Sequence, residues 1–144
     1  MTEHFSLDEL TASQTATRQG IKNTPSTAVV ENLRMLATLL EQVRTLLGSH
    51  SIRISSGYRS VALNRHIGSN DTSAHIRGYA ADFTCPSFGT PLEVAKEIAE
   101  SNLKFDQLIY EGTWVHISCD PQNRRQLLTA RFEHGHTYYT TGIA

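Results

Sequence analysis

The apolar residues between Pro25 and Gly48 recur every three or four positions, which is the spacing of one face of an α-helix. They are Val29, Leu33, Leu36, Leu40, Val43 and Leu47. Pro25 can occupy the first helical position, and Gly48 follows the last apolar residue of the pattern. The pattern therefore predicts a long helix that packs its apolar face on the core, and nothing on it suggests chemistry.

Shorter helices are predicted where a Ser or Thr precedes a Glu by three positions, because these two side chains cap a helix reciprocally. Such capping boxes occur at Ser6-Leu7-Asp8-Glu9 and at Thr90-Pro91-Leu92-Glu93. Ser60 can cap a further helical turn over residues 62–65. We therefore expect helices to begin at these three places.

Apolar and β-prone runs between these helices predict short strands. They cover residues 52–56, 79–84, 107–111 and 114–118, and a tail hairpin over 127–139 that turns at His134-Gly135. Gly112-Thr113 has glycine first in a two-residue turn, which predicts a hairpin between the third and fourth runs. The expected fold class is α+β, with helices packed on a single antiparallel sheet. By length we expect one domain over 1–144, with a helical part at about 6–48, a middle part at about 51–120 and a C-terminal hairpin at about 125–144.

The composition is that of an ordinary globular protein. Of the 144 residues 39% are hydrophobic, and the formal net charge is −1. This near-neutral balance gives no sign of a nucleic-acid partner, and no run is long enough to insert in a membrane. The two cysteines, Cys85 and Cys119, each lie three residues after a candidate ligand, so on a strand they face away from it and are expected in the core rather than on a metal or in a disulfide.

Two histidines and an aspartate form the most informative pattern in the chain. His75 and Asp82 lie seven residues apart with Gly78 between them, and His116 follows in the fourth β-prone run. Two imidazoles and a carboxylate are the ligand set of a catalytic zinc ion that keeps one position open for water. We expect His75 on a loop and Asp82 on the strand that follows it.

The expected hairpin places a further carboxylate near this ligand set. With Gly112-Thr113 as the turn, Glu111 lies opposite Trp114, and therefore on the same face as His116 and diagonal to it. A carboxylate at this position can act as a general base without being a ligand. Ile109, opposite His116, is expected to form part of the wall. Arg59 follows a strand end and can grip a substrate carboxylate or stabilise an oxyanion.

These motifs resemble those of a known family. Ser56-Gly57-Tyr58-Arg59-Ser60, Ser73-x-His75-x-x-Gly78-x-Ala80-x-Asp82 and Trp114-Val115-His116 are similar to the motifs of the zinc D-alanyl-D-alanine carboxypeptidases. The same family contains phage endolysins that cut L-alanyl-D-glutamate bonds and vancomycin-resistance D,D-dipeptidases. The Hedgehog signalling domain shares the zinc site. The resemblance is expected to run over nearly the whole chain, into the Thr137-Tyr138-Tyr139 tail.

The resemblance implies roles for individual residues. It implies that His75, Asp82 and His116 bind one zinc ion, and that an arginine such as Arg59 contacts substrate or oxyanion. Ser73 matches a serine that hydrogen-bonds substrate in some members. Many members carry the catalytic acid three residues before the last histidine, where this chain has Thr113. The base role therefore passes to Glu111, five residues before it.

Other readings of these side chains remain open. Trp114 shares the His116 face and is a candidate for the wall of the cleft, although plain packing explains it equally well. Ser73 can also simply hydrogen-bond its own loop. His134 and His136 mimic a second metal pair, but they flank Gly135 in a turn and are expected to be exposed and without a metal.

The expected activity is hydrolysis of a peptide bond in bacterial peptidoglycan by a monomeric zinc metallopeptidase. The bond is that of a D-Ala-D-Ala carboxypeptidase, or that of an L-Ala-D-Glu or cross-link endopeptidase. The alternative is a catalytically inert, zinc-stabilised binding or virion-structural domain. No basic-then-apolar signal peptide begins the chain, so we expect synthesis in the bacterial cytoplasm and action on the wall after holin-type release or as part of a phage particle.

Overall fold

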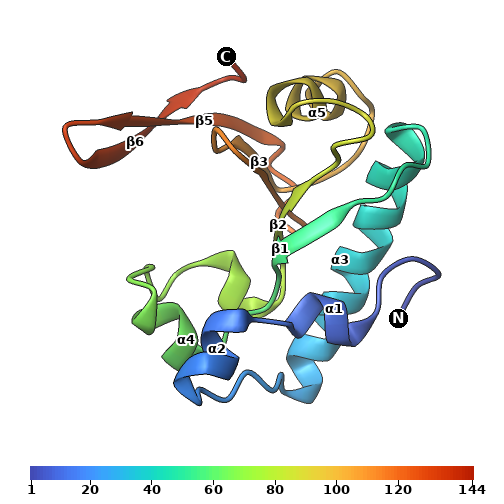
Figure 1. Cartoon of the computed structure of the whole chain (residues 1–144). Coiled ribbons are helices and arrows are strands. Elements are labelled where there is room, and N and C mark those ends of the chain that lie inside the picture. Colours follow the sequence, from blue (N-terminus) through green and yellow to red (C-terminus); the bar gives the residue numbers. More distant parts are fainter.

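Six strands form one sheet in the order β1-β2-β4-β3-β5-β6 in the computed structural model, which describes residues 1–144 (Figure 1). The strands are β1 Arg53–Ser56, β2 Ala80–Thr84, β3 Gln107–Tyr110, β4 Val115–Ser118, β5 Gln126–Glu133 and β6 His136–Thr141. Neighbouring strands are antiparallel, except that β3 and β5 run parallel. The α+β class is confirmed, but the sheet is mixed rather than purely antiparallel.

The parallel pair arises from the path of the loop between β4 and β5. After β4 the chain passes the beginning of β3 and continues on the far side of that strand, with Gln107 paired to Gln126. Backbone hydrogen bonds from Arg125 to Phe105 and from Gln126 to Asp106 hold the crossing. Residues 119–125 therefore wrap around one end of the sheet.

Five α-helices accompany the sheet. They are α1 Leu7–Thr11, α2 Gln14–Gln19, α3 Thr27–Leu46, α4 Val61–His66 and α5 Pro91–Ala99. Thr90 and Glu93 form the predicted capping box, and Ser60 caps α4 as expected. The prediction for Pro25 is wrong by two positions, because the hydroxyl of Ser26 accepts from the Val29 amide and caps α3. Helix α2 has no counterpart among the sequence predictions, since it buries only Ala16 and so lacks an apolar stripe.

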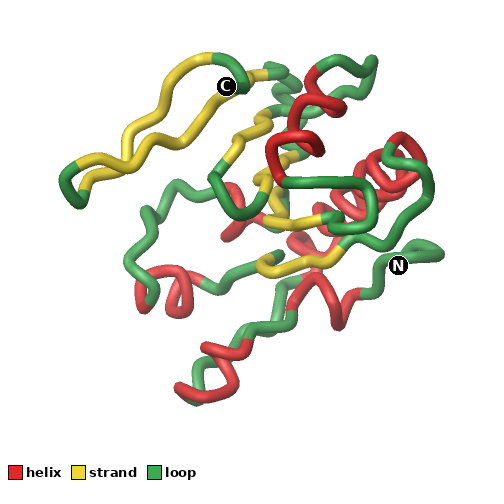
Figure 2. Tube along the Cα trace, turned by 45° about the horizontal axis from the view of Figure 1, so that its top comes forward, coloured by secondary structure: helices red, strands yellow, loops and turns green.

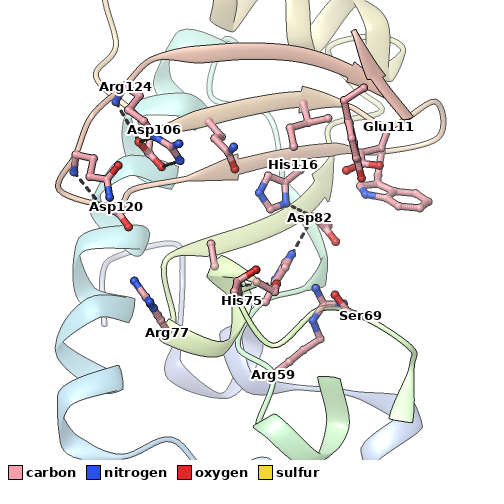
Figure 3. Close-up of a pocket in the computed structure, with 18 residues that line it drawn as sticks. Arg59, Ser69, His75, Arg77, Asp82, Asp106, Glu111, His116, Asp120 and Arg124 are labelled. Carbon is pink, nitrogen blue, oxygen red and sulfur yellow. Dashed lines mark hydrogen bonds and ion pairs between the residues drawn. The ribbon is translucent and has the colours of Figure 1, made fainter. Parts of the chain in front are cut away.

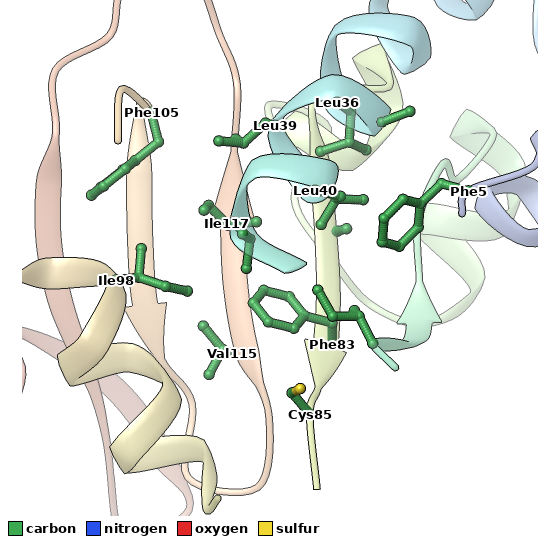
Figure 4. Packing of buried hydrophobic residues seen from close by; sticks show 14 of the residues in the cluster. Phe5, Leu36, Leu39, Leu40, Phe83, Cys85, Ile98, Phe105, Val115 and Ile117 are labelled. Atoms are coloured by element: carbon green, nitrogen blue, oxygen red, sulfur yellow. The ribbon is translucent and has the colours of Figure 1, made fainter. Parts of the chain in front are cut away.

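The core lies between α3, α5 and one face of the sheet. Phe83, Val115 and Ile117 point from β2 and β4 toward these helices, where Leu40 and Ile98 meet them (Figure 4). Because successive strand residues point to opposite faces, Asp82 and His116 are turned to the other side. The packing that fixes β2 and β4 therefore also fixes these two polar side chains.

The β5–β6 hairpin extends beyond the rest of the sheet in both views (Figures 1 and 2). Its turn is the predicted His134-Gly135, with φ values of +50° and +77°. Phe132 and Tyr139 are more than half exposed on it. None of the helices combines the length and the apolar character that crossing a membrane requires.

Candidate metal centre and cleft

The polar face of β2, β4 and β3 carries one row of aligned residues. Asp82 lies opposite His116, and His116 lies opposite Ile109. His75 approaches this row from a short 3-10 helix, Ala74–Arg77, rather than from the irregular loop that the sequence predicted. The candidate ligands thus come from three separate segments that meet on one face (Figure 3).

The three candidate ligands meet closely. One ligand atom from each of His75, Asp82 and His116 lies within 4.8 Å of the others. His75 Nε2 is 3.3 Å from Asp82 Oδ1, and His116 Nδ1 is 2.9 Å from the same oxygen. A tetrahedral zinc ion with bonds of about 2.0–2.2 Å holds its ligand atoms roughly 3.3–3.6 Å apart. The observed separations therefore fit one zinc ion after small side-chain movements.

The protonation of His75 supports this fit. Its Nδ1 lies 2.7 Å from the Gly57 carbonyl, which can only accept, so Nδ1 carries the proton. Burial lowers the pKa of His75, although the Asp82 carboxylate opposes this effect. In the neutral ring Nε2 presents a lone pair to the Asp82 carboxylate. The His75 Nε2 lone pair and the Asp82 oxygen would repel each other, and a cation bound between them stabilises this arrangement, as in a metal site.

The backbone next to β1 holds His75 in place. The Arg59 amide donates to the His75 carbonyl over 3.1 Å, while the His75 ring donates to Gly57. The Ser73 hydroxyl accepts from the His75 amide and so caps the 3-10 helix. Gly78 ends it with φ +76°. Ser73 therefore has a structural task here, and its contact with substrate stays a prediction.

The Asp82 carboxylate lies between the imidazole rings of His75 and His116. Burial alone would raise its pKa, but the hydrogen bond with His116 and the proximity of the two imidazoles outweigh burial and hold the pKa of Asp82 below its usual range. The carboxylate is therefore ionised at neutral pH, as a metal ligand must be.

The hairpin places Glu111 where the sequence predicted it. The Glu111 amide donates to the Trp114 carbonyl over 3.0 Å, so these two residues lie opposite each other across the Gly112-Thr113 turn. Gly112 adopts φ +88°, which a side chain would disfavour. Burial raises the pKa of Glu111, with a further contribution from Asp82 and opposition from His116. A carboxyl with a raised pKa near a metal site is suited to exchanging protons with substrate and water.

A cleft of about 550 Å³ runs along this face and contains every predicted site residue. Besides the three ligands they are Arg59, Ser73, Glu111 and Trp114. The Arg59 Nε and the Trp114 Nε1 are buried and have no hydrogen-bond partner. Burial lowers the pKa of Arg59 while the Asp82 carboxylate favours its charged form. Arg59 therefore offers an unused donor beside the ligands.

The sequence predictions did not include three further cleft residues, two of which depend on the path of the chain through the sheet. Tyr139 reaches the cleft from β6, Arg77 from the 3-10 helix, and Arg124 from the loop before β5. No local motif marks them as site residues. Only the strand order, which brings β5 and β6 beside β3, could have placed Tyr139 there.

The residues predicted to lie outside the site do so. Cys85 is buried and Cys119 half-buried, and both are free thiols. Burial raises the pKa of Cys119 to about 12, so it stays protonated. His134 and His136 are exposed on the distal turn of the hairpin.

Comparison with known families gives one match. The model of the family described as Peptidase M15 matches residues 3–118. None of the curated proteins matches the chain significantly. The matched span contains the three candidate ligands, Arg59 and Glu111, and it ends with β4. The loop that carries Arg124 and the tail with Tyr139, into which the resemblance was expected to extend, lie beyond it.

Proposed function

We propose, since this chain belongs to the peptidase M15 family, that it hydrolyses a peptide bond of bacterial peptidoglycan. The family match confirms the resemblance that the motifs indicated. Together with the cluster of His75, Asp82 and His116 it makes the chain a metallopeptidase with one candidate zinc site. The observation that carries the proposal is the position of Glu111, a carboxylate with a raised pKa in the same cleft as this cluster.

The proposed mechanism divides the work among the cleft residues. His75, Asp82 and His116 hold one zinc ion, which when bound supplies Lewis-acid activation of water and of the substrate carbonyl. Glu111 takes the proton from the attacking water and delivers it to the leaving amine, for which a pKa raised by burial is favourable. The unpartnered Arg59 donor faces the developing oxyanion or a substrate carboxylate.

The cleft walls orient the stem peptide in this proposal. Trp114 forms one wall, Ile109 lies opposite His116 as predicted, and Ser73 lines the cleft as the N-cap of the 3-10 helix. The cut bond is that of a D-Ala-D-Ala carboxypeptidase or of an L-Ala-D-Glu or cross-link endopeptidase. The cleft has lining residues on both sides of the ligands, Glu111 on one side and Arg124 on the other, so a peptide can extend in both directions from them.

The biological setting of the proposal is a phage or prophage. A monomeric enzyme of this size, made in the bacterial cytoplasm, would reach the wall through a holin-type partner or as part of the phage particle. The alternative of an inert zinc-stabilised binding domain is disfavoured by Glu111, because a purely structural metal site has no need of a half-buried carboxylate beside it.

The test is digestion of purified peptidoglycan by the zinc-loaded protein, with mass spectrometry of the released fragments. Wild type should release fragments whose masses identify the bond. Glu111→Gln should bind one zinc ion but turn over at least a hundredfold more slowly. His75→Ala, as the control for the metal, should lose zinc and activity together. Zinc-loaded wild-type protein that releases nothing would favour the binding-domain alternative, and a fully active Glu111→Gln variant would refute the base assignment.

A further inference from the structure

We propose that Arg124 forms a carboxylate-binding subsite at the end of the cleft away from Glu111, and that Asp106 positions it there. Figure 3 shows Arg124 and Asp106 on one side of the His75, Asp82 and His116 cluster, with Glu111 on the other side. The inference rests on the proposed function, because its ligand is a carboxylate of the stem peptide. Asp106 lies within residues 3–118, which the family model matches, whereas Arg124 lies beyond them.

A buried carboxylate orients Arg124. Asp106 is only 3% exposed, and both of its oxygens face the guanidinium. Arg124 Nε donates to Oδ1 over 2.9 Å, Nη2 donates to Oδ2 over 2.8 Å, and the Arg124 amide donates to Oδ1 over 3.1 Å. Two parallel hydrogen bonds fix the plane of the guanidinium as well as its position.

The side of Arg124 that faces away from Asp106 is available to a ligand. The side chain is 49% exposed and lines the cleft. A guanidinium has five N–H donors, and Asp106 uses two of them. The remaining donors can form a charge-assisted pair with a second carboxylate.

The orientation of Arg124 is not needed to attach the loop to the rest of the fold, because Arg125 already makes the attaching contacts. Arg125 donates to the carbonyls of Leu103 and Ser101, and its guanidinium lies 4.8 Å from the centre of the Phe105 ring. Asn123 and Arg125 have φ values of +45° and +52°, a left-handed conformation that Asn tolerates but that is unfavourable for Arg125. The left-handed backbone on each side of Arg124 turns the consecutive arginines in different directions, Arg125 to Phe105 and Arg124 to the cleft.

The formal charges at this end of the cleft balance without a ligand. Arg77 also lines it and has no ion-pair partner. Asp120 is the one free acidic group here, and its Oδ1 accepts from the Gln122 amide over 2.9 Å. The formal charges of Asp106 and Asp120 cancel those of Arg124 and Arg77, so a ligand carboxylate is held by the N–H donors of Arg124 that Asp106 leaves unused rather than by an excess of positive charge. A stem peptide offers such carboxylates at its D-glutamate and at its C-terminus.

The test compares three synthetic pentapeptides by isothermal titration. They are L-Ala-γ-D-Glu-L-Lys-D-Ala-D-Ala, the same peptide with the D-glutamate α-carboxylate as carboxamide, and the same peptide with a C-terminal carboxamide. The protein is zinc-loaded Glu111→Gln, and mass spectrometry verifies that each peptide stays intact. One of the two carboxamides should bind about tenfold more weakly than the parent peptide.

Adding Arg124→Gln should reduce that difference to less than twofold, and Arg124→Lys should leave an intermediate one because it keeps the charge but loses the fork. Arg34→Gln, an exposed arginine on α3, is the matched control and should change nothing. Thermal unfolding checks that each variant is folded. If Arg124→Gln does not fold, the comparison is made with Arg124→Lys alone. Equal binding of all three peptides, or a difference that persists in both Arg124 variants, overturns the subsite alone. Failure of every peptide to bind contradicts the proposed function and overturns the subsite with it.

Discussion

Tyr138 and Tyr139 are neighbours on β6 whose side chains point to opposite faces of the sheet. Tyr139 lines the cleft, whereas the Tyr138 hydroxyl donates to Glu133 over 3.1 Å on the other face. Burial, together with the charges of Glu111 and Asp82, raises the pKa of Tyr139. Its hydroxyl therefore stays protonated at neutral pH and is a donor beside the general base.

Removing this hydroxyl should slow catalysis without disturbing the metal. We expect Tyr139→Phe to lower kcat/KM roughly tenfold, the effect of one hydrogen bond to substrate or transition state. Zinc stoichiometry and Tm should be unchanged. Tyr138→Phe is the matched control and should retain full kcat/KM on the same peptide substrate. Equal activity of the two variants would remove Tyr139 from the site.

At the scale of elements, the ligand His75 depends on the contact between α1 and the end of β1. A Cβ on Gly57 would lie 2.3 Å from the Leu10 carbonyl oxygen, which already accepts from the Tyr58 amide over 2.7 Å. The Gly57 carbonyl in turn accepts from the His75 ring. The absent side chain thus allows α1 to pack against the segment that orients His75.

Gly57→Ala should therefore weaken both the fold and the metal site. The clash is with backbone, so we expect a loss of about 1–3 kcal/mol in the free energy of unfolding. We also expect about tenfold or more weaker zinc binding, as for other groups that orient a ligand. Gly68→Ala is the control, because Gly68 has φ +80° but no atom within 4 Å of its added Cβ. Gly68→Ala should lower the free energy of unfolding but leave zinc affinity unchanged. Chelator competition and thermal unfolding separate the two effects, and wild-type zinc affinity in Gly57→Ala would contradict the coupling.

Elements with local signals were predictable from the sequence, and elements set by chain path were not. The capped helices α4 and α5 and the Gly112-Thr113 hairpin follow from residues within a few positions of each other. That hairpin also brought Glu111 to the His116 face. The parallel pairing of β3 with β5 depends instead on the route of residues 119–125, which is held by the hydrogen bonds that Arg125 donates to the carbonyls of Leu103 and Ser101. Because no local pattern encodes that route, Tyr139 and Arg124 could not be placed in the cleft.

At the scale of the molecule, the cleft draws on residues from Arg59 to Tyr139, so global stability and the site are linked. The N-terminal segment contributes to this stability by a tether to α3. The His4 amide donates to Glu41 Oε2 over 2.7 Å, and the His4 Nδ1 lies 2.8 Å from Oε1. Burial alone would raise the pKa of Glu41, but these hydrogen bonds outweigh it and lower the pKa from 4.5 to about 2.

A lowered pKa in the folded state makes this tether sensitive to acid. The ionised carboxylate stabilises the fold fully above its unfolded pKa, near 4.5, and this contribution is lost as the pH falls toward 2. We expect Glu41→Gln to be less stable than wild type at pH 6, with a gap in the free energy of unfolding that closes between pH 4.5 and 2. Urea unfolding of the zinc-free proteins measures this gap without competition between protons and metal. Glu31→Gln, which breaks only the exposed pair with Arg34 on the same helix, should differ little from wild type at any pH. A Glu41→Gln gap that is constant with pH would show that the carboxylate is not held in its charged form, and the tether would then contribute packing alone.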